Sequence, residues 1–404
     1  MPAARPSLLV LDEVPEARAA YSFWRILADL EVISTPARDD GTPFGGADAL
    51  ELPAELGDAA RVLAGRESHV PGEVADACAA VWEWAEQRGM PELALQFAEA
   101  AARLEPDSSA RAATAGRLCR RRSERIRGTL WFRRAARLAR VSHAKTAEVD
   151  FAIAHLGWGN LESDLGRFGE AEKHADKGRR AALRVGRRSL AASAYHDLMT
   201  IRIHSGRLDE AAAHARSAVA FYKPEHPRVP ALAHDIAFLW ACRGFFSSAA
   251  PLYDAVLPFI HLAAERVVVL ANQARAAGAC RDRLRYERAY QAVERLRQAG
   301  ETVPASAFYH LAEGCRSFEE WNRAEQCCLL ALRLAGERGN ALTVAQAQQL
   351  LAGLRVRAPG DRDVVPPEGG EVDLVRESLL RKLRKHAPGA RPRAVPPEKY
   401  PIEQ

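Results

Sequence analysis

Two histidine–aspartate pairs are the residues of this sequence best suited to polar chemistry. His196-Asp197 and His234-Asp235 each begin fifteen residues before an alanine, Ala211 or Ala249. An imidazole titrates near neutral pH, so a histidine at such a place can donate, accept or bind a proton. Two interpretations stay open: the pairs hold an extended peptide by hydrogen bonds and stacking, or each satisfies a hydrogen bond between helices. A metal site is disfavoured, because histidines on neighbouring parallel helices lie roughly 10 Å apart.

No sequence motif of an enzyme accompanies these histidines. The patterns GxSxG, GxGxxG, HExxH, CxxC and the P-loop are all absent from the sequence, which argues against the enzyme classes that depend on them. The seven cysteines are an odd number and mostly fall within helical patterns, as is typical of small buried thiols in a reducing compartment. We therefore expect no catalytic residue, no metal and no cofactor.

Charge is distributed unevenly along the chain. Residues 1–110 contain 20 acidic and 8 basic residues and residues 111–190 contain 20 basic and 8 acidic residues, although the formal net charge of the chain is only +5. Basic side chains are densest in a patch that comprises Arg117, Arg120, Arg121, Arg122, Arg125, Arg133, Arg134 and Arg137. An acidic partner for it is nucleic acid, an acidic protein segment or the N-terminal half of the same molecule.

The same arginines have a simpler interpretation. Arginine often lies on solvated helix faces and extends its apolar stem over neighbouring side chains. Trp131 and Phe132 are interleaved with the arginines, but they fit the turn of a helix pair better than a platform for stacked bases. Nucleic acid is therefore the less favoured partner.

The elements that position these residues are clearest between Ala147 and Gly186. The first half of this stretch supplies apolar surface at helical spacing, and Gly159 leaves room for a neighbouring helix. The second half repeats small residues at steps of three and four, and the tripeptide 166–168 between the halves predicts a turn. Two such amphipathic helices cannot bury both of their faces alone, so the pair needs neighbours.

The same skeleton returns along the chain. It consists of a small residue with a large apolar residue three positions earlier and a residue that can pack four positions later. Seven alanines, 35 to 41 residues apart, anchor it: Ala94, Ala135, Ala171, Ala211, Ala249, Ala289 and Ala324. Six of them have the large apolar residue, and Pro91 stands in its place before Ala94. A glycine precedes four of them by five positions, whereas Leu130, Leu284 and Glu319 stand there in the others. The pattern predicts an all-α array of about seven helix pairs.

From Glu73 to Leu354 this series resembles the tetratricopeptide repeat (TPR) family, in its divergent form with long repeats known from bacterial regulators. The resemblance implies a right-handed α-solenoid whose first helices line a concave groove. By position, the partner-binding groove residues would be Asn160, His196, Thr200, His234, Phe238, Tyr309 and Glu313. The lysine-and-asparagine clamp with which some family members bind chaperone C-termini is absent at the matching positions.

Three regions follow from this reading of the chain. Residues 1–70 are expected to form an N-terminal helical cap and linker, and residues 71–357 the repeat array with a final capping helix over 340–357. Residues 358–404 read as a flexible tail rich in proline and arginine, with one short basic helix over 373–386. No secretory signal and no stretch of ~20 apolar residues is found, so we expect a cytoplasmic protein.

The function that this sequence favours is non-catalytic binding of a protein or peptide in the groove, as an adaptor or regulatory scaffold. The alternative is a nucleic-acid-associated regulator that binds through the basic patch, and self-association of the acidic and basic regions is a third possibility. Salt separates the first two, because contacts to phosphate weaken steeply with salt concentration.

Overall fold

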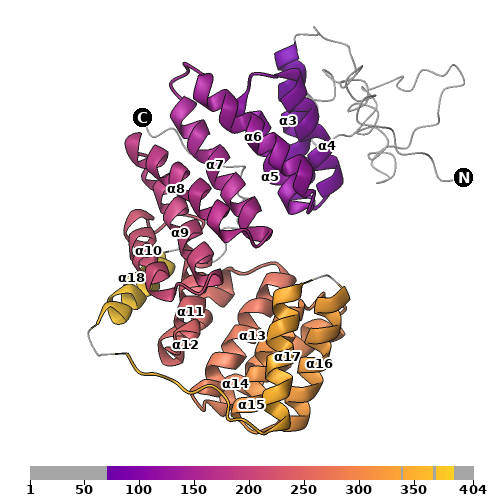
Figure 1. Cartoon of the computed structure of the whole chain (residues 1–404), viewed down its shortest axis with the longest axis vertical. Helices are drawn as coiled ribbons and strands as arrows, with labels where there is room; N and C mark the ends of the chain where they lie inside the picture. Colours follow the sequence, from indigo (N-terminus) through magenta and orange to yellow (C-terminus); the bar gives the residue numbers. More distant parts are fainter. Residues whose placement is uncertain (1–70, 338–339, 367–369, 386–404) are drawn as a thin grey trace, which may run out of the picture. The chain divides into compact units, whose positions relative to one another are not determined.

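The computed structural model describes residues 71–337, 340–366 and 370–385, and every regular element in these ranges is a helix (Figure 1). The described chain divides into two compact units, residues 71–197 and 198–385, and the division falls inside α9 (Arg188–His204). The predicted N-terminal cap, residues 1–70, lies outside the described ranges.

The first unit is built from three helix pairs and the beginning of α9. The pairs are α3 (Pro71–Gln87) with α4 (Pro91–Leu104), α5 (Ser109–Arg121) with α6 (Arg125–Val141), and α7 (Ala147–Asp164) with α8 (Phe168–Arg184). The members of each pair pack on each other, and α5 also packs on α7, so that successive first helices lie side by side.

The second unit continues the same arrangement. After α10 (Leu208–Phe221) come α11 (Val229–Cys242) with α12 (Phe246–Val256) and the short 3-10 helix η4 (Leu257–Phe259), α13 (Ala263–Ala279) with α14 (Arg283–Gln298), and α15 (Ala305–Ser317) with α16 (Trp321–Glu337). The helix α17 (Ala341–Arg355) packs on α15 and α16, as predicted for the last helix of the array.

The seven alanines of the sequence pattern are all buried. All of them are at most 2% exposed, and the residue four positions later in each repeat is buried as well. A Cβ atom at Gly159 would lie only 3.0 Å from the carbonyl oxygen of Ala171, which is the close helix approach expected there. The chain is thus an all-α array of TPR-like helix pairs, seven of them in its described part, and the prediction of the fold class is confirmed.

The positions of the turn residues show that the alanine pattern placed two repeats in the wrong register. In each pair one residue between the two helices has a positive φ angle: Gly89, Ser123, Gly166, Gly206, Gly244, Arg281 and Glu319. In five repeats this residue precedes the alanine of the pattern by five positions, but in the second and sixth repeats Ala135 and Ala289 lie further along the helix. Leu130 and Leu284 therefore do not break the turn rule. The turn residues there are Ser123 and Arg281, which adopt φ = 58° although non-glycine residues rarely do.

Beyond α17 the chain remains in contact with the second unit. Residues 358–366 run along the turns of the array, and α18 (Glu371–Lys385) then packs on α10, α11 and α12 (Figure 1). Leu379 and Leu383 are buried, and Lys382 Nζ donates to the carbonyl oxygen of Tyr222 at 2.6 Å. The described residues after 357 are thus part of the folded unit rather than a flexible tail, and the basic helix lies against α10, α11 and α12.

Candidate functional site

The residues assigned to the groove all lie on first helices, as the sequence pattern requires. Asn160 is on α7, His196 and Thr200 are on α9, His234 and Phe238 are on α11, and Tyr309 and Glu313 are on α15. His196 and Glu313 are buried, whereas the other five side chains are partly exposed. The structure therefore places the whole set on first helices and buries two of the seven side chains.

In the first unit this position joins neighbouring first helices. The amide of Asn160 on α7 donates to Asp197 Oδ2 on α9 at 3.3 Å. Asp197 is itself only 5% exposed. The Asp197 carboxylate thus serves a contact between two successive repeats, which agrees with the interpretation of these pairs as hydrogen bonds between helices.

In the second unit, the matching position on α11 also forms a hydrogen bond to the next first helix. His234 Nδ1 lies 2.9 Å from Asp235 Oδ1, and its Nε2 accepts from the Asn272 amide on α13 at 3.4 Å. The ring of Phe238 meets the edge of the His310 ring on α15, with the centroids 6.1 Å apart. Partly exposed surface remains on Phe238 at this layer of first helices.

Glu313 belongs to an ionic cluster at the end of α15. It accepts from the hydroxyl of Tyr309 at 3.2 Å and from Arg316 at 2.6 Å. Burial, and next the nearby carboxylate of Asp361, raise the pKa of Glu313. Sequence reasoning missed Asp361, because it lies in the segment that was assigned to the flexible tail.

A second cluster that sequence reasoning missed joins the two helices of the third repeat. His155 on α7 and His174 on α8 are both buried, and their Nδ1 atoms lie 2.8 Å apart. Trp158 stacks on His174 at 4.1 Å between ring centroids and donates to the buried Glu162 at 3.1 Å. Burial, and next the His174 ring, lower the pKa of His155 to about 3. Two imidazoles can form a hydrogen bond when both are neutral or when only one is charged. Protonation of both rings at low pH therefore breaks this contact between α7 and α8.

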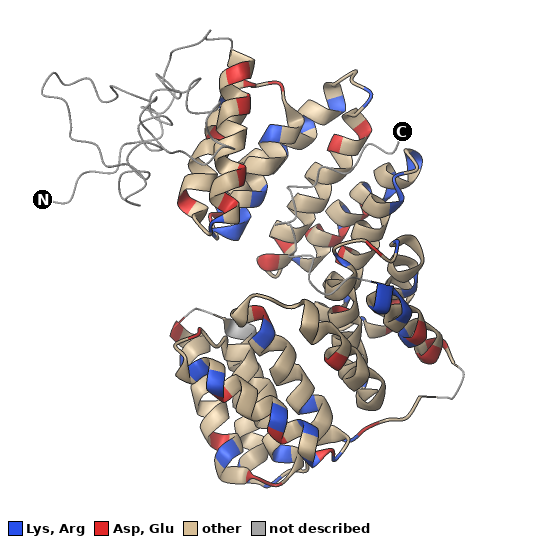
Figure 2. Cartoon of the chain, turned by 180° about the vertical axis from the view of Figure 1, so that it is seen from behind, with Lys and Arg blue, Asp and Glu red and all other residues tan. Residues whose placement is uncertain are grey.

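Half of the basic patch, Arg117, Arg120, Arg121 and Arg122, is neutralised by carboxylates within the first unit. Arg117 donates through both terminal nitrogens to Glu86, at 2.8 and 3.1 Å, and Arg121 pairs with the same carboxylate. Arg120 pairs with Asp164 at 2.6 Å. Glu86 is on α3 and Asp164 on α7, and Figure 2 shows acidic and basic residues distributed together over the helices of the first unit. The acidic partner of these arginines is therefore largely the chain itself, one of the three partners considered above.

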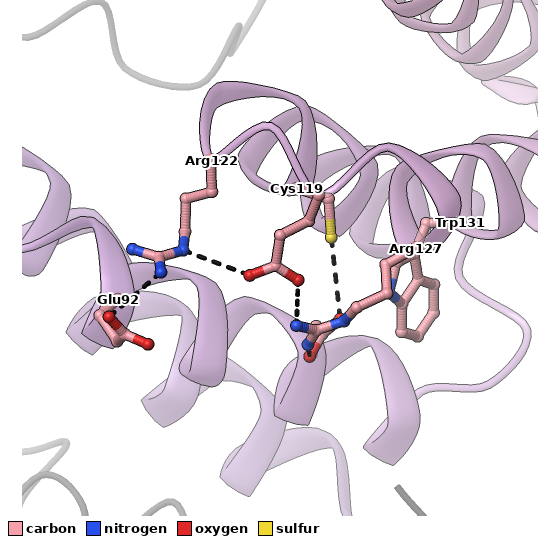
Figure 3. Close-up of polar contacts among 7 residues, drawn as sticks. Glu92, Cys119, Arg122, Arg127 and Trp131 are labelled. Carbon is pink, nitrogen blue, oxygen red and sulfur yellow. Dashed lines mark hydrogen bonds and ion pairs between the residues drawn. The ribbon is translucent and has the colours of Figure 1, made fainter. Parts of the chain in front are cut away.

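The pairing continues into a partly buried network (Figure 3). Arg122 contacts Glu92 at 3.1 Å, and Arg127 pairs with the buried Glu99. Glu99 also accepts from Trp131 Nε1 at 2.8 Å. The indole of Trp131 is thus hydrogen-bonded to a carboxylate on α4, which argues against its use for stacking on bases. Burial, and next the Glu99 charge, raise the pKa of Cys119 to about 12, so this thiol stays protonated.

One face of α6 is different, because it is exposed and its charges are not paired. Ile126 is 81%, Leu130 58% and Val141 62% exposed. Arg133 and Arg137 are exposed between them, and neither has a hydrogen-bond or ion-pair partner among the described residues. At 100° per residue these five positions fall within one side of the helix. Arg125 is exposed as well, while Arg134 donates to the carbonyl oxygen of Pro106 at 2.9 Å.

Within the described ranges, no group of three or more histidine, cysteine or acidic residues is placed to hold a metal ion. None of the helices seen in the structure combines the length and the apolar character that a bilayer span requires.

Comparison with known proteins yields similar folds only. No known protein family matches the sequence, and no curated protein matches it. Aspartyl phosphate phosphatase F from Bacillus subtilis is 10% identical over 91% of this chain and 100% of its own, with a TM-score of 0.47. A Rap protein in complex with the competence and sporulation factor is 12% identical, over 87% and 96% of the two chains, with a TM-score of 0.46.

A tetratricopeptide repeat protein from Parabacteroides merdae is 12% identical over 70% of this chain and 100% of its own, with a TM-score of 0.44. All three TM-scores are below 0.5. The description of this chain as TPR-like therefore rests on its own buried alanines and turns.

Proposed function

We propose that this chain is a non-catalytic repeat protein that binds another protein, and that the exposed face of α6 contacts the partner. The observation that carries the proposal is the row of exposed apolar side chains Ile126, Leu130 and Val141 with the unpaired Arg133 and Arg137 between them. Several large apolar side chains on one side of a surface helix are typical of an interaction site.

The chemistry of this face favours one kind of partner. Fifteen residues of helix separate Ile126 from Val141, a length of about 22 Å, which suits a partner helix lying along α6. The partner's contacting face would be apolar and flanked by acidic residues, because these complement the uncovered arginines. Nucleic acid uses the arginines but gains nothing from three exposed aliphatic side chains, and the nearby Trp131 is already bonded to Glu99.

Affinity capture with four forms of the full chain tests this function. The forms are the wild type, Ile126→Ser/Leu130→Ser, the first-helix variant Phe238→Ala, and the control Leu284→Ser, which removes a leucine that is 62% exposed on α14. Loss of two buried aliphatic contacts costs about 2 kcal/mol or more, which is roughly a 30-fold loss of affinity. We expect a protein retained by the wild type and the control, and lost from the α6 variant.

Two other outcomes contradict this proposal in different ways. A partner lost only from Phe238→Ala moves the site to the layer of first helices. Recovery that disappears on nuclease treatment supports the nucleic-acid alternative, which direct binding of a labelled oligonucleotide over a salt series then checks through its steep salt dependence.

A further inference from the structure

Residues 360–364 of the C-terminal segment, with the sequence Gly-Asp-Arg-Asp-Val, lie on the second unit as a bound peptide would. The segment is extended and alternates: Asp361 and Asp363 are partly buried against the array, while Arg362 and Val364 are exposed. Alternate side chains of an extended chain point to opposite sides. One side of the segment therefore makes the polar contacts, and on the other side Arg362 is exposed while the half-exposed Val364 side chain still lies beside Gly244.

The first contact is a carboxylate held by two arginines. Asp361 Oδ2 accepts from Arg275 at 2.7 and 3.1 Å, and Asp361 Oδ1 lies 3.4 Å from Arg316. Burial opposes the charge of Arg275, but Asp361 and then Glu313 outweigh it and raise the pKa of Arg275. A buried guanidinium without a carboxylate is costly, so this position requires an acidic side chain from whatever segment lies there.

The second contact is at the start of α12. The N-cap residue of this helix, Phe245, offers no side-chain acceptor. Asp363 Oδ1 accepts instead from the backbone N–H of Ser247 at 2.9 Å. A carboxylate at this place satisfies one of the open N–H groups of the first turn and is favoured by the helix dipole.

Backbone contacts fix the register of the segment. The N–H of Val364 donates to the carbonyl oxygen of Gly244 at 2.8 Å. At the other end, Gly360 lies so close to the last residue of α15 that a Cβ atom there would be 2.6 Å from Ser317 Cα. The site therefore selects a glycine, then an aspartate, and a second aspartate two residues later, in extended conformation.

Between Pro359 and Val365 the segment is held mainly by polar contacts. Val364 is 51% and Val365 74% exposed and Pro359 is exposed as well, and apolar burial resumes only at Pro366. Segments with few buried apolar contacts are at the low end of local stability. The helices α17 and α18, which flank the segment, have their own contacts with the array.

We propose that Gly244, Ser247, Arg275 and Arg316 form a binding site for an extended acidic segment with the pattern Gly-Asp-x-Asp. Residues 360–364 occupy it as an intramolecular ligand, and a partner with the same pattern binds by displacing them. The site lies in the second unit and is built from residues other than those of the α6 face, so either proposal can fail without the other.

The test uses the full chain and a labelled peptide that copies residues 358–366, followed by fluorescence anisotropy. Three proteins are compared: the wild type, Asp361→Asn/Asp363→Asn, in which the internal ligand is weakened, and the same variant with Arg275→Gln. A tethered segment has an effective concentration on the order of 1 mM. A peptide with a dissociation constant near 0.1 mM is therefore expected to bind the double variant about tenfold more tightly than it binds the wild type.

Two controls show that the gain comes from the site. A peptide with asparagine at both aspartate positions is expected not to bind, and Arg275→Gln is expected to abolish the gain. Gly360→Ala provides a second route, since its methyl group displaces the segment while every residue of the site stays intact, and it is compared with Gly336→Ala, where a Cβ meets no atom within 4 Å.

Equal binding of the aspartate peptide to the wild type, the double variant and Gly360→Ala would overturn the proposal, as would equal binding of the aspartate and asparagine peptides. Circular dichroism spectra check that each variant is folded. If the double variant is unfolded, the comparison of Gly360→Ala with the wild type decides alone.

Discussion

The buried histidine pair of the third repeat makes the stability of the first unit depend on pH. His155→Asn tests this, because an asparagine reproduces the hydrogen bond that Nδ1 makes to His174 and does not titrate. His174, Trp158 and Phe151 lie against the replaced ring, Glu162 accepts from Trp158, and the charge of Lys177 also acts on His155. The matched control is His143→Asn, at an exposed position in the loop after α6.

The sign and size of the effect follow from proton binding. The pKa of His155 falls from 6.5 to about 3 on folding, so below pH 6.5 the unfolded chain binds a proton that the folded chain does not. The contribution of the neutral His155 ring to the free energy of unfolding is fully present above pH 6.5 and is lost as the pH falls toward 3. Between pH 7 and pH 5 the loss is about 2 kcal/mol. The pKa of His174 is also lowered, first by burial, and acts in the same direction.

The assay is urea unfolding at pH 7 and pH 5 at constant ionic strength, followed by circular dichroism and tryptophan fluorescence. The wild type and His143→Asn are expected to lose about 2 kcal/mol more between the two pH values than His155→Asn does. Other titrating groups cancel in this difference. If all three proteins show the same pH dependence, the His155 ring is not a neutral buried group and the reasoning is refuted.

Three further predictions concern packing and reactivity. Gly314→Ala is expected to destabilise the second unit by about 1–3 kcal/mol, because its Cβ would lie 2.9 Å from the Ala274 carbonyl oxygen; thermal unfolding beside Gly336→Ala measures this, and equal melting temperatures would contradict it. Phe132→Ala is expected to cost about 3–5 kcal/mol, since Phe132 is 1% exposed; an unchanged urea midpoint would show that the site collapses without loss. Cys119, whose pKa is raised to about 12, is expected to react with iodoacetamide at pH 8 only after unfolding, and rapid labelling of the native chain would disprove its burial.

The repeat pattern was predictable because it depends on local spacing. A small residue where two helices touch is required in every pair, so the seven alanines repeat in the sequence and all are buried in the structure. The second and sixth repeats lost their register because Gly128 and Tyr286, and not an alanine, stand five positions after the turn residues Ser123 and Arg281. The seventh repeat also lacks a turn glycine, but its register was kept because Ala324 follows the turn residue Glu319 by five positions.

The candidate site was predictable only in part. The charge imbalance of the chain was visible in the sequence, but which arginines are neutralised was not. Arg117 and Arg133 are the same residue type in the same repeat, and one is paired with Glu86 while the other has no partner among the described residues. The difference depends on which helix face meets the acidic first pair.

The sequence by itself determined the helices, their pairing and the excess of basic residues in the second repeat, because these depend on composition and on spacings within about forty residues. The tertiary structure decided which polar residues meet. His155 finds His174 across one pair of helices, and Asp361 finds Arg275 from 86 residues away. Contacts of this kind depend on the paths of separate elements through space, and a linear pattern holds no record of them.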